Sequence, residues 1–132
     1  MFRLSKRVEY GLMALQHLAK SGNATTREIS AARQIPYDLL AKVMQSLKRD
    51  GIVDSYQGVN GGYALLISPS SVNLSRVMSA LDEDANITEC MSADGVHEQC
   101  SMYGNCTIKD PMSKLQLRME ESVGKMTIAE LL

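Results

Sequence analysis

The chain has 132 residues, of which 45% are hydrophobic and 22% are charged, and its formal net charge is −1. This length and composition are ordinary for one globular domain with its own core, with or without an appended helix. No apolar run approaches the roughly 20 residues of a membrane span. The first 20 residues contain Glu9, Gln16 and His17, so we expect no signal peptide and a reducing, cytoplasmic location.

The small net charge conceals an uneven distribution along the chain. Residues 1–50 hold nine Lys and Arg against four Asp and Glu, a net charge of +5. Residues 51–132 hold five Lys and Arg against eleven Asp and Glu, a net charge of −6. A cationic N-terminal half suits a phosphate backbone, and the acidic half would then face away from DNA. Random scatter of surface charge is the alternative.

Apolar spacing predicts three helices at the start of the chain. The first covers residues 4–20, where apolar side chains recur at helical intervals. A capping-box pattern, with Thr25 before the helix and Glu28 three positions later, starts a second helix that runs through Ala32. The third helix covers residues 37–49. Two short helices with a tight join predict a helix-turn-helix motif, although many small helical domains share this pattern.

A β-hairpin is predicted directly after these helices. Residues 52–57 and 63–67 alternate as strands do, and the glycine-rich residues 58–62 form the turn between them. A hairpin in this place is the wing of a winged helix, and glycines at its tip let the backbone approach a duplex closely. A hairpin that only caps the core is the alternative.

The polar face of the third predicted helix carries the candidate base contacts. Gln45 can pair with adenine through two hydrogen bonds, and Lys42 can approach guanine. The candidates for the floor of the major groove are Tyr37, Asp38, Ala41, Lys42 and Gln45. The candidates for phosphate contacts are Lys48, Arg49, Arg27, Lys6 and Arg7. The candidates at the wing tip are Gly58, Asn60 and Gly61.

Two more helices are predicted after the hairpin. Asn73 caps one that runs through Leu81, and the last begins at Asp110, with Pro111 at its first position. The last helix has a narrow apolar stripe, made of Met112, Leu115, Met119, Val123 and Met126. Such a stripe predicts a homodimer formed with a second copy of the same helix. An amphipathic helix folded back on its own domain is the alternative.

The predicted fold is mostly α with a small β-hairpin, a winged helix-turn-helix with a C-terminal dimerisation helix. Residues 1–81 form the DNA-binding domain, residues 82–109 a cysteine-bearing loop, and residues 110–132 the dimerisation helix and tail. No Ser-His-acid set and no phosphate-cradling glycine loop before a helix is present, so we expect no enzyme and no catalytic residues.

All three cysteines, Cys90, Cys100 and Cys106, lie in the predicted loop among polar residues and glycines. Three thiols on one loop can reach a common point, which suits a metal ion or an iron–sulphur cluster. Their odd number argues against a framework of intramolecular disulphides. A redox dithiol or plain surface cysteines remain open on spacing alone.

The whole pattern resembles the winged-helix iron–sulphur transcription regulators typified by IscR and NsrR. The resemblance rests on the opening Leu4-Ser5-Lys6 and Glu9-Tyr10-Gly11-Leu12, on the wing Gly58-x-x-Gly61-Gly62-Tyr63, and on three cysteines before a C-terminal helix. It implies a dimer that binds duplex DNA at a palindromic operator. It also implies an iron–sulphur cluster, [2Fe–2S] or [4Fe–4S], on Cys90, Cys100 and Cys106, whose state controls DNA binding.

Some details depart from the IscR and NsrR pattern. Nine residues separate Cys90 from Cys100, where IscR and NsrR have five, and the wider gap resembles the branch that regulates the SUF cluster-assembly genes. The histidine that follows the third cysteine of IscR is missing. The position of the acidic ligand that NsrR takes from the other subunit is occupied by Glu9, which the resemblance makes the first candidate for a fourth ligand, with His97 the second. Gln57 stands where wings of this family usually carry Arg or Lys.

The sequence therefore predicts a cytoplasmic, dimeric transcriptional regulator, most simply a repressor, that senses cluster status, redox state or nitric oxide. One alternative keeps the winged helix and gives the cysteine loop structural zinc or thiol oxidation. Another is a small cluster-carrying or redox protein that does not bind DNA.

Overall fold

The computed structural model describes residues 3–59, 61–83 and 103–132. In chain order its elements are α1 (Lys6–Ser21), β1 (Asn23–Ala24), α2 (Thr26–Arg33), α3 (Tyr37–Arg49), β2 (Val53–Tyr56), β3 (Gly62–Leu65), η1 (Pro69–Ser71), α4 (Leu74–Ala80), η4 (Tyr103–Asn105), α5 (Lys109–Lys125) and η5 (Ile128–Leu131). The predictions for Asn60, Cys90, His97 and Cys100 concern residues outside the described ranges. Among the helices of those ranges, none combines the length and the hydropathy needed to cross a membrane.

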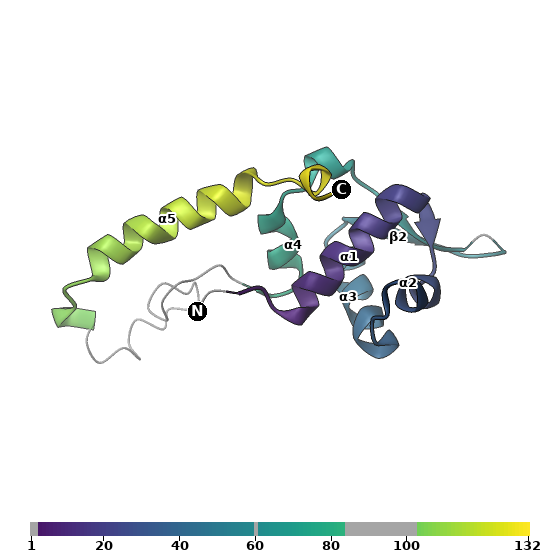
Figure 1. Cartoon of the computed structure of the whole chain (residues 1–132), viewed down its shortest axis with the longest axis horizontal. Helices are drawn as coiled ribbons and strands as arrows, with labels where there is room; N and C mark the ends of the chain where they lie inside the picture. The colour runs from purple at the N-terminus through teal and green to yellow at the C-terminus, as the bar shows by residue number, and fades with distance from the viewer. Residues whose placement is uncertain (1–2, 60, 84–102) are drawn as a thin grey trace.

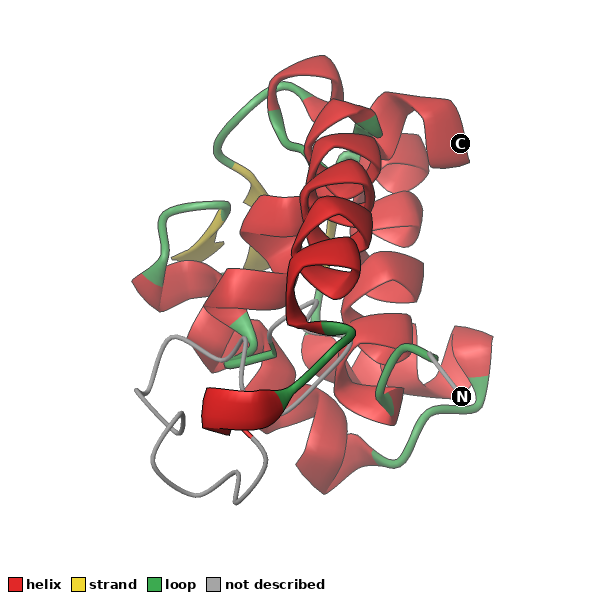
Figure 2. Ribbon diagram, turned by 90° about the vertical axis from the view of Figure 1, so that its left-hand side faces the viewer, coloured by secondary structure: helices red, strands yellow, loops and turns green. Residues whose placement is uncertain are grey.

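Figure 1 shows how these elements are arranged. Helices α1 to α4 pack together, the β2–β3 hairpin projects from one end of this group, and α5 reaches away from the other end. From its distant start, α5 runs back toward this group, so that η5, which follows it, lies against α1 and η1. Viewed from the left-hand side, α5 crosses in front of the other helices (Figure 2).

Side-chain caps start the helices at the predicted places. The Thr25 hydroxyl accepts a hydrogen bond from the Glu28 N–H at 3.0 Å, and the Asn73 side-chain oxygen accepts one from the Arg76 N–H at 2.8 Å. Ser5 caps α1 in the same way. These caps satisfy N–H groups that have no acceptor within the helix. The predicted helix starts in this part of the chain are confirmed.

The small sheet has three antiparallel strands in the order β1-β3-β2. The β2–β3 hairpin confirms the predicted wing, whereas β1 was not predicted because two residues carry no periodic pattern. Gly62 sits where β3 meets β1, with φ at +140°, and a Cβ atom there would lie 2.6 Å from the Ala24 carbonyl oxygen. Only glycine fits this approach, which brings the base of the wing close to the start of α2.

One apolar core joins α1, α3 and α4 to the C-terminal tail. The inner face of α3 consists of four residues that are inaccessible to solvent: Leu40, Val43, Met44 and Leu47. Gly11 lets α4 approach α1, because a Cβ atom at this position would lie 2.8 Å from Leu81 Cδ1. The rotation of α3 about its own axis is therefore fixed, and its polar face is turned outward.

The C-terminal part differs from the prediction in two ways. Helix α5 begins at Lys109, so the prediction that Pro111 holds the first helical position is wrong, and it holds the third. Proline is tolerated there because first-turn N–H groups lack helical acceptors in any case. The last residues form η5, which was not predicted. Thr127 and Glu130 make its capping box, and Ile128 is 1% exposed in the core.

The predicted apolar stripe of α5 is divided between two environments. Val123 packs against the core, while Leu115 is 44% exposed. Gln116 is buried, and Leu117, which lies outside the predicted stripe, is 59% exposed. The helix thus contacts α4 and leaves Leu115 and Leu117 uncovered.

Candidate nucleic-acid interface and metal ligands

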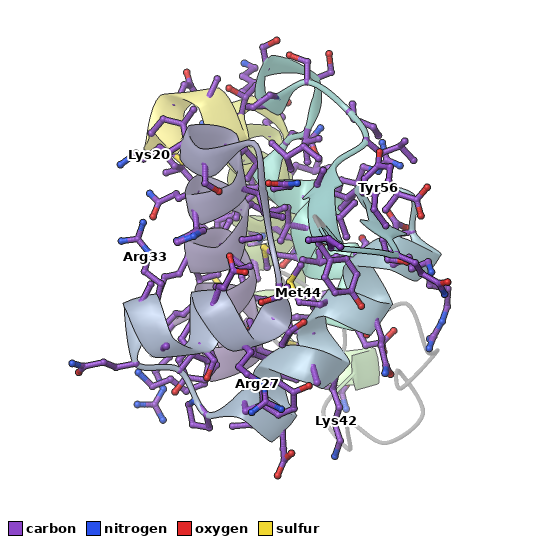
Figure 3. All side chains as sticks on the ribbon, turned by 90° about the vertical axis from the view of Figure 1, so that its right-hand side faces the viewer. Lys20, Arg27, Arg33, Lys42, Met44 and Tyr56 are labelled. Atoms are coloured by element: carbon purple, nitrogen blue, oxygen red, sulfur yellow. The ribbon has the colours of Figure 1, made fainter. Side chains whose placement is uncertain are left out.

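The polar face of α3 is turned to solvent, as base contacts would require. Of the five predicted groove-floor residues, Tyr37, Asp38, Lys42 and Gln45 are exposed and Ala41 is half-buried. Figure 3 shows Lys42 projecting from the end of the molecule that α2 and α3 form. These side chains share one face because their spacing matches the helical repeat and the other face is in the core. Their role as base contacts stays a prediction.

Arg27 of α2 lies over the ring of Tyr37 at the start of α3. The guanidinium carbon is 5.2 Å from the ring centroid, within the range of a cation–π contact. Figure 3 shows Arg27 at the same end of the molecule as Lys42. Neither of the two ion pairs found in the described part of the chain includes Arg27, so its charge is not neutralised by a carboxylate there.

Three of the other predicted phosphate contacts have partners within the chain. Lys48 Nζ donates to the Ser55 hydroxyl at 2.7 Å, which ties the end of α3 to β2. Arg7 reaches the Ser46 hydroxyl at 3.5 Å. Lys6 donates to a nearby carboxylate on α1, and this hydrogen bond, followed by the charge attraction, raises the pKa of Lys6. Lys48 therefore positions the wing against α3 in addition to any contact with DNA.

The turn of the wing depends on its glycines. Gly58 has φ at +111°, and its carbonyl oxygen accepts from the Gly61 N–H at 2.9 Å. A Cβ atom at Gly61 would lie 2.8 Å from the carbonyl oxygens of both Gly58 and Tyr56. The backbone of this turn can therefore approach another surface without side chains in between. Val59, which was not among the predicted contacts, is fully exposed beside it.

An open groove of about 390 Å³ lies between the start of α2, the start of α3 and the base of the wing. Its lining consists of Thr25, Thr26, Arg27, Tyr37, Ser55, Tyr56, Gly62 and Tyr63. We call it the tyrosine groove. Burial, and after it the nearby Tyr37, raises the pKa of Tyr63. The residues that line the groove come from α2, α3, β2 and β3, so only the strand alternation of the hairpin could have pointed to Tyr63 in advance.

Glu9 and Cys106 are the candidate metal ligands within the described ranges. Glu9 lies in the first turn of α1, and its carboxylate accepts from Lys6 Nζ at 2.9 Å. Cys106 is half-buried between η4 and α5. Figure 1 places the start of α5 well apart from the first turn of α1. In the part of the chain that the structure describes, no three His, Cys, Asp or Glu side chains gather closely enough to hold a metal ion.

The residue at the entrance to the predicted cysteine loop is bound to the start of α1. The Glu83 carboxylate accepts from the Ser5 backbone N–H at 3.0 Å and from the Ser5 hydroxyl at 2.5 Å. Ser5 is the residue that caps α1, and Glu9 follows one turn later. The start of the loop and the turn that carries Glu9 are therefore held together within one chain.

Comparison with known proteins agrees with this architecture. The model of the Rrf2 family, described as iron-dependent transcriptional regulators, matches residues 4–132. The transcriptional regulator IscR of Yersinia pseudotuberculosis is 26% identical over 132 residues, which cover 98% of this chain and 78% of that protein. The structure of CymR, the global cysteine regulator of B. subtilis, matches with a TM-score of 0.76 at 19% identity, over 99% of this chain and 96% of CymR.

A second solved structure, IscR of T. potens, matches with a TM-score of 0.72 at 20% identity, over 98% of this chain and 85% of that one. The solved structures share the fold of this chain, and the family model spans nearly all of its length. The predictions of a winged-helix fold, of a DNA-binding regulator and of a protein that is not an enzyme are confirmed. The chain belongs to the Rrf2 family of transcriptional regulators.

Proposed function

We propose that the protein is a homodimeric, cytoplasmic repressor whose binding to operator DNA is controlled by an iron–sulphur cluster. Cys90, Cys100 and Cys106 of one subunit would hold the cluster, and Glu9 of the partner subunit would supply the fourth ligand. The observation that carries the proposal is the gathering of all three cysteines of the chain in one polar segment between α4 and α5. The resemblance to IscR supports it, and the cluster-assembly genes are the proposed targets.

The set of donor atoms fits an iron–sulphur cluster. Thiolates are the ligands that such clusters prefer, and three of them leave one position for a different donor. A carboxylate oxygen is a hard and weak ligand for such a site, so the iron that it binds would be open to oxygen or nitric oxide. When bound, the cluster would supply redox chemistry that the chain alone lacks. The protein residues would hold the cluster and bind DNA.

The position of Glu9 supports donation between subunits. Its side chain is 41% exposed, and its partner Lys6 is 75% exposed, so the pair can separate at small cost. Within one chain the start of α5, next to Cys106, lies far from α1 (Figure 1). A second copy that packed on the uncovered leucines of α5 would bring another α1 to the loop.

The contacts of α1 suggest how cluster occupancy would change DNA affinity. Helix α1 packs against α3, and its first turn carries both Glu9 and the Ser5 contact to Glu83. A cluster bound at Glu9 would hold α1 of one subunit to the loop of the other and so fix the distance between the two α3 helices. Loss of the cluster would release that distance and shift the population of DNA-competent dimers.

Anaerobic purification and ultraviolet–visible spectroscopy, with iron and sulphide analysis, test the proposal. The wild-type protein should show charge-transfer bands between about 300 and 600 nm, as thiolate-bound clusters do. Cys106→Ala should lose them. Glu9→Ala should lose its cluster faster under nitric oxide and lose the dependence of DNA affinity on the cluster. Glu28→Ala, which removes another exposed first-turn carboxylate, should behave as the wild type.

Two results would change the assignment. A protein that stays colourless after incubation with iron and sulphide would contradict the cluster, and zinc analysis and thiol titration would then separate the two alternatives. An unchanged cluster and unchanged DNA affinity in Glu9→Ala would exclude Glu9 and leave His97 as the next ligand to replace. The winged-helix assignment does not depend on either result.

A further inference from the structure

We infer that the tyrosine groove seats the sugar–phosphate backbone of one DNA strand, with Arg27 and Tyr63 as direct phosphate contacts. Tyr63 was not a predicted contact, and the groove lies between the two elements expected to reach DNA. The inference rests on the proposed entry of α3 into the major groove. It concerns the DNA-binding surface alone and is independent of any cluster.

The lining of the groove is suited to a polyanion. It provides phenol and hydroxyl groups and one guanidinium, and none of the described residues that line it carries a carboxylate. A guanidinium keeps its N–H donors in its own plane, so stacking on the Tyr37 ring orients Arg27 without using those donors. A tyrosine hydroxyl is protonated, and hence a donor, throughout the physiological pH range, and burial raises the pKa of Tyr63 further above that range.

The walls of the groove are fixed before any ligand binds. On one side, the approach of Gly62 to Ala24 holds the base of the wing against the start of α2. On the other side, the 2.7 Å hydrogen bond from Lys48 to Ser55 ties α3 to β2. Ser55 stands opposite Tyr63 in the hairpin register, so these two residues face the same side of the sheet. The donors therefore form a preorganised surface.

The location selects a DNA backbone as the occupant. The sugar–phosphate backbone is the ridge that separates the major groove of a duplex from the minor groove. A protein that places α3 in the major groove and a hairpin beside it must straddle that ridge, and the tyrosine groove is the hollow between these two elements. Figure 3 shows Arg27 and Lys42 together at the α2–α3 end of the molecule.

The test compares Tyr63→Phe and Arg27→Met with two matched controls, Tyr10→Phe on α1 and Arg118→Met on α5. Affinity is measured on a duplex of unrelated sequence and on an operator selected from a random library, at several salt concentrations. Tyr63→Phe should weaken binding to both duplexes by about three- to tenfold, the range for one ordinary hydrogen bond. The ratio of the two affinities should stay unchanged, since phosphate contacts carry no sequence information.

A second measurement separates direct contact from a structural role. Arg27→Met should lower the slope of log affinity against log salt by about one, as the loss of one phosphate contact does. In a second set of operator duplexes, one phosphate at a time is replaced by an uncharged methylphosphonate. At the phosphate that Tyr63 contacts, the wild type and Tyr63→Phe should bind the modified duplex with equal affinity. A fold defect would instead weaken every duplex alike.

Three outcomes would overturn the inference. The first is wild-type affinity for both duplexes in both groove variants. The second is that Tyr63→Phe weakens binding to every duplex of the methylphosphonate set, whichever phosphate is neutralised. The third is that inorganic phosphate raises the melting temperature of the wild type but not of Arg27→Met, while the DNA affinity of Arg27→Met equals that of the wild type. This result would assign the groove to a free anion. Equal losses in Tyr10→Phe would also contradict a local contact.

Discussion

Arg76 of α4 holds Asp50, the residue that ends α3, through two different groups. Its Nε donates to the Asp50 carboxylate at 2.9 Å, and its Nη2 donates to the Asp50 backbone carbonyl at 2.9 Å. A cation at this place also complements the negative end of the helix dipole. The helix whose polar face reads DNA in this proposal is thus anchored at its C-terminal end by the helix that leads into the cysteine segment.

Arg76→Met should cost little stability, at most about 1 kcal/mol, because both side chains are more than a third exposed and water screens the pair. Urea denaturation of Arg76→Met, Asp50→Asn and the double variant measures the coupling directly. Arg76→Lys keeps the charge but cannot make both contacts, and it should fall between Arg76→Met and the wild type. A loss of several kcal/mol in Arg76→Met would show that the contact does more than position α3.

Gly62→Ala should destabilise the protein by about 1–3 kcal/mol, because φ at +140° is strained for any side chain and the Cβ atom would meet the Ala24 carbonyl. Gly124→Ala is the matched control. Its Cβ would meet nothing within 4 Å, and alanine favours the helix, so this variant should be neutral or more stable by up to about 1 kcal/mol. Equal thermal shifts in the two variants would contradict the strain at Gly62.

Local patterns in the sequence were sufficient for the helices and the wing. Caps such as Thr25 and Asn73 act within four residues, and the inner face of α3 follows from spacing along one helix, so both were readable in advance. The short strand β1 and the tail were missed. Their conformations depend on pairing with β3 and on burial of Ile128 against distant residues, although the Thr127-x-x-Glu130 capping box was a visible signal.

The candidate site was predictable only where one element carries it. The exposed face of α3 met the expectation, whereas the tyrosine groove combines residues from α2, α3 and the hairpin, which no single pattern joins. The intramolecular partners of Lys48 and Arg7 likewise come from other parts of the fold. The roles of Cys90, Cys100 and Glu9 as ligands stay predictions.

Glu83→Ala should lower the free energy of unfolding by about 1 kcal/mol, since it removes the acceptor for the Ser5 backbone N–H and hydroxyl. Ser5→Ala should cost a similar amount, because it removes the hydroxyl that caps α1. The two losses should not add in the double variant, as both act on the same start of α1. Additive losses in chemical denaturation would show that Glu83 and Ser5 act independently.

Tyr63 should titrate above the ordinary tyrosine pKa of 10.0, since burial raises its pKa. Between pH 10.0 and the higher folded pKa, the unfolded chain has lost the proton that the folded chain keeps, so the free energy of unfolding falls as pH rises. Below pH 10.0 both the folded and the unfolded chain keep this proton, so the contribution of Tyr63 to the free energy of unfolding no longer changes with pH. Absorbance titration of the phenolates should lose its late step in Tyr63→Phe and keep it in Tyr10→Phe.

Leu117→Lys should convert the proposed dimer to a single chain. Leu117 is 59% exposed on α5, and a charge placed at this uncovered side chain would have to be buried in the proposed interface without a partner. Leu66→Lys is the matched control, because Leu66 is 56% exposed on the β3 side of the molecule, away from α5. Light scattering coupled to size exclusion gives the mass of each variant. A monomeric wild type, or a Leu117→Lys protein that stays dimeric, would place the contact between copies elsewhere.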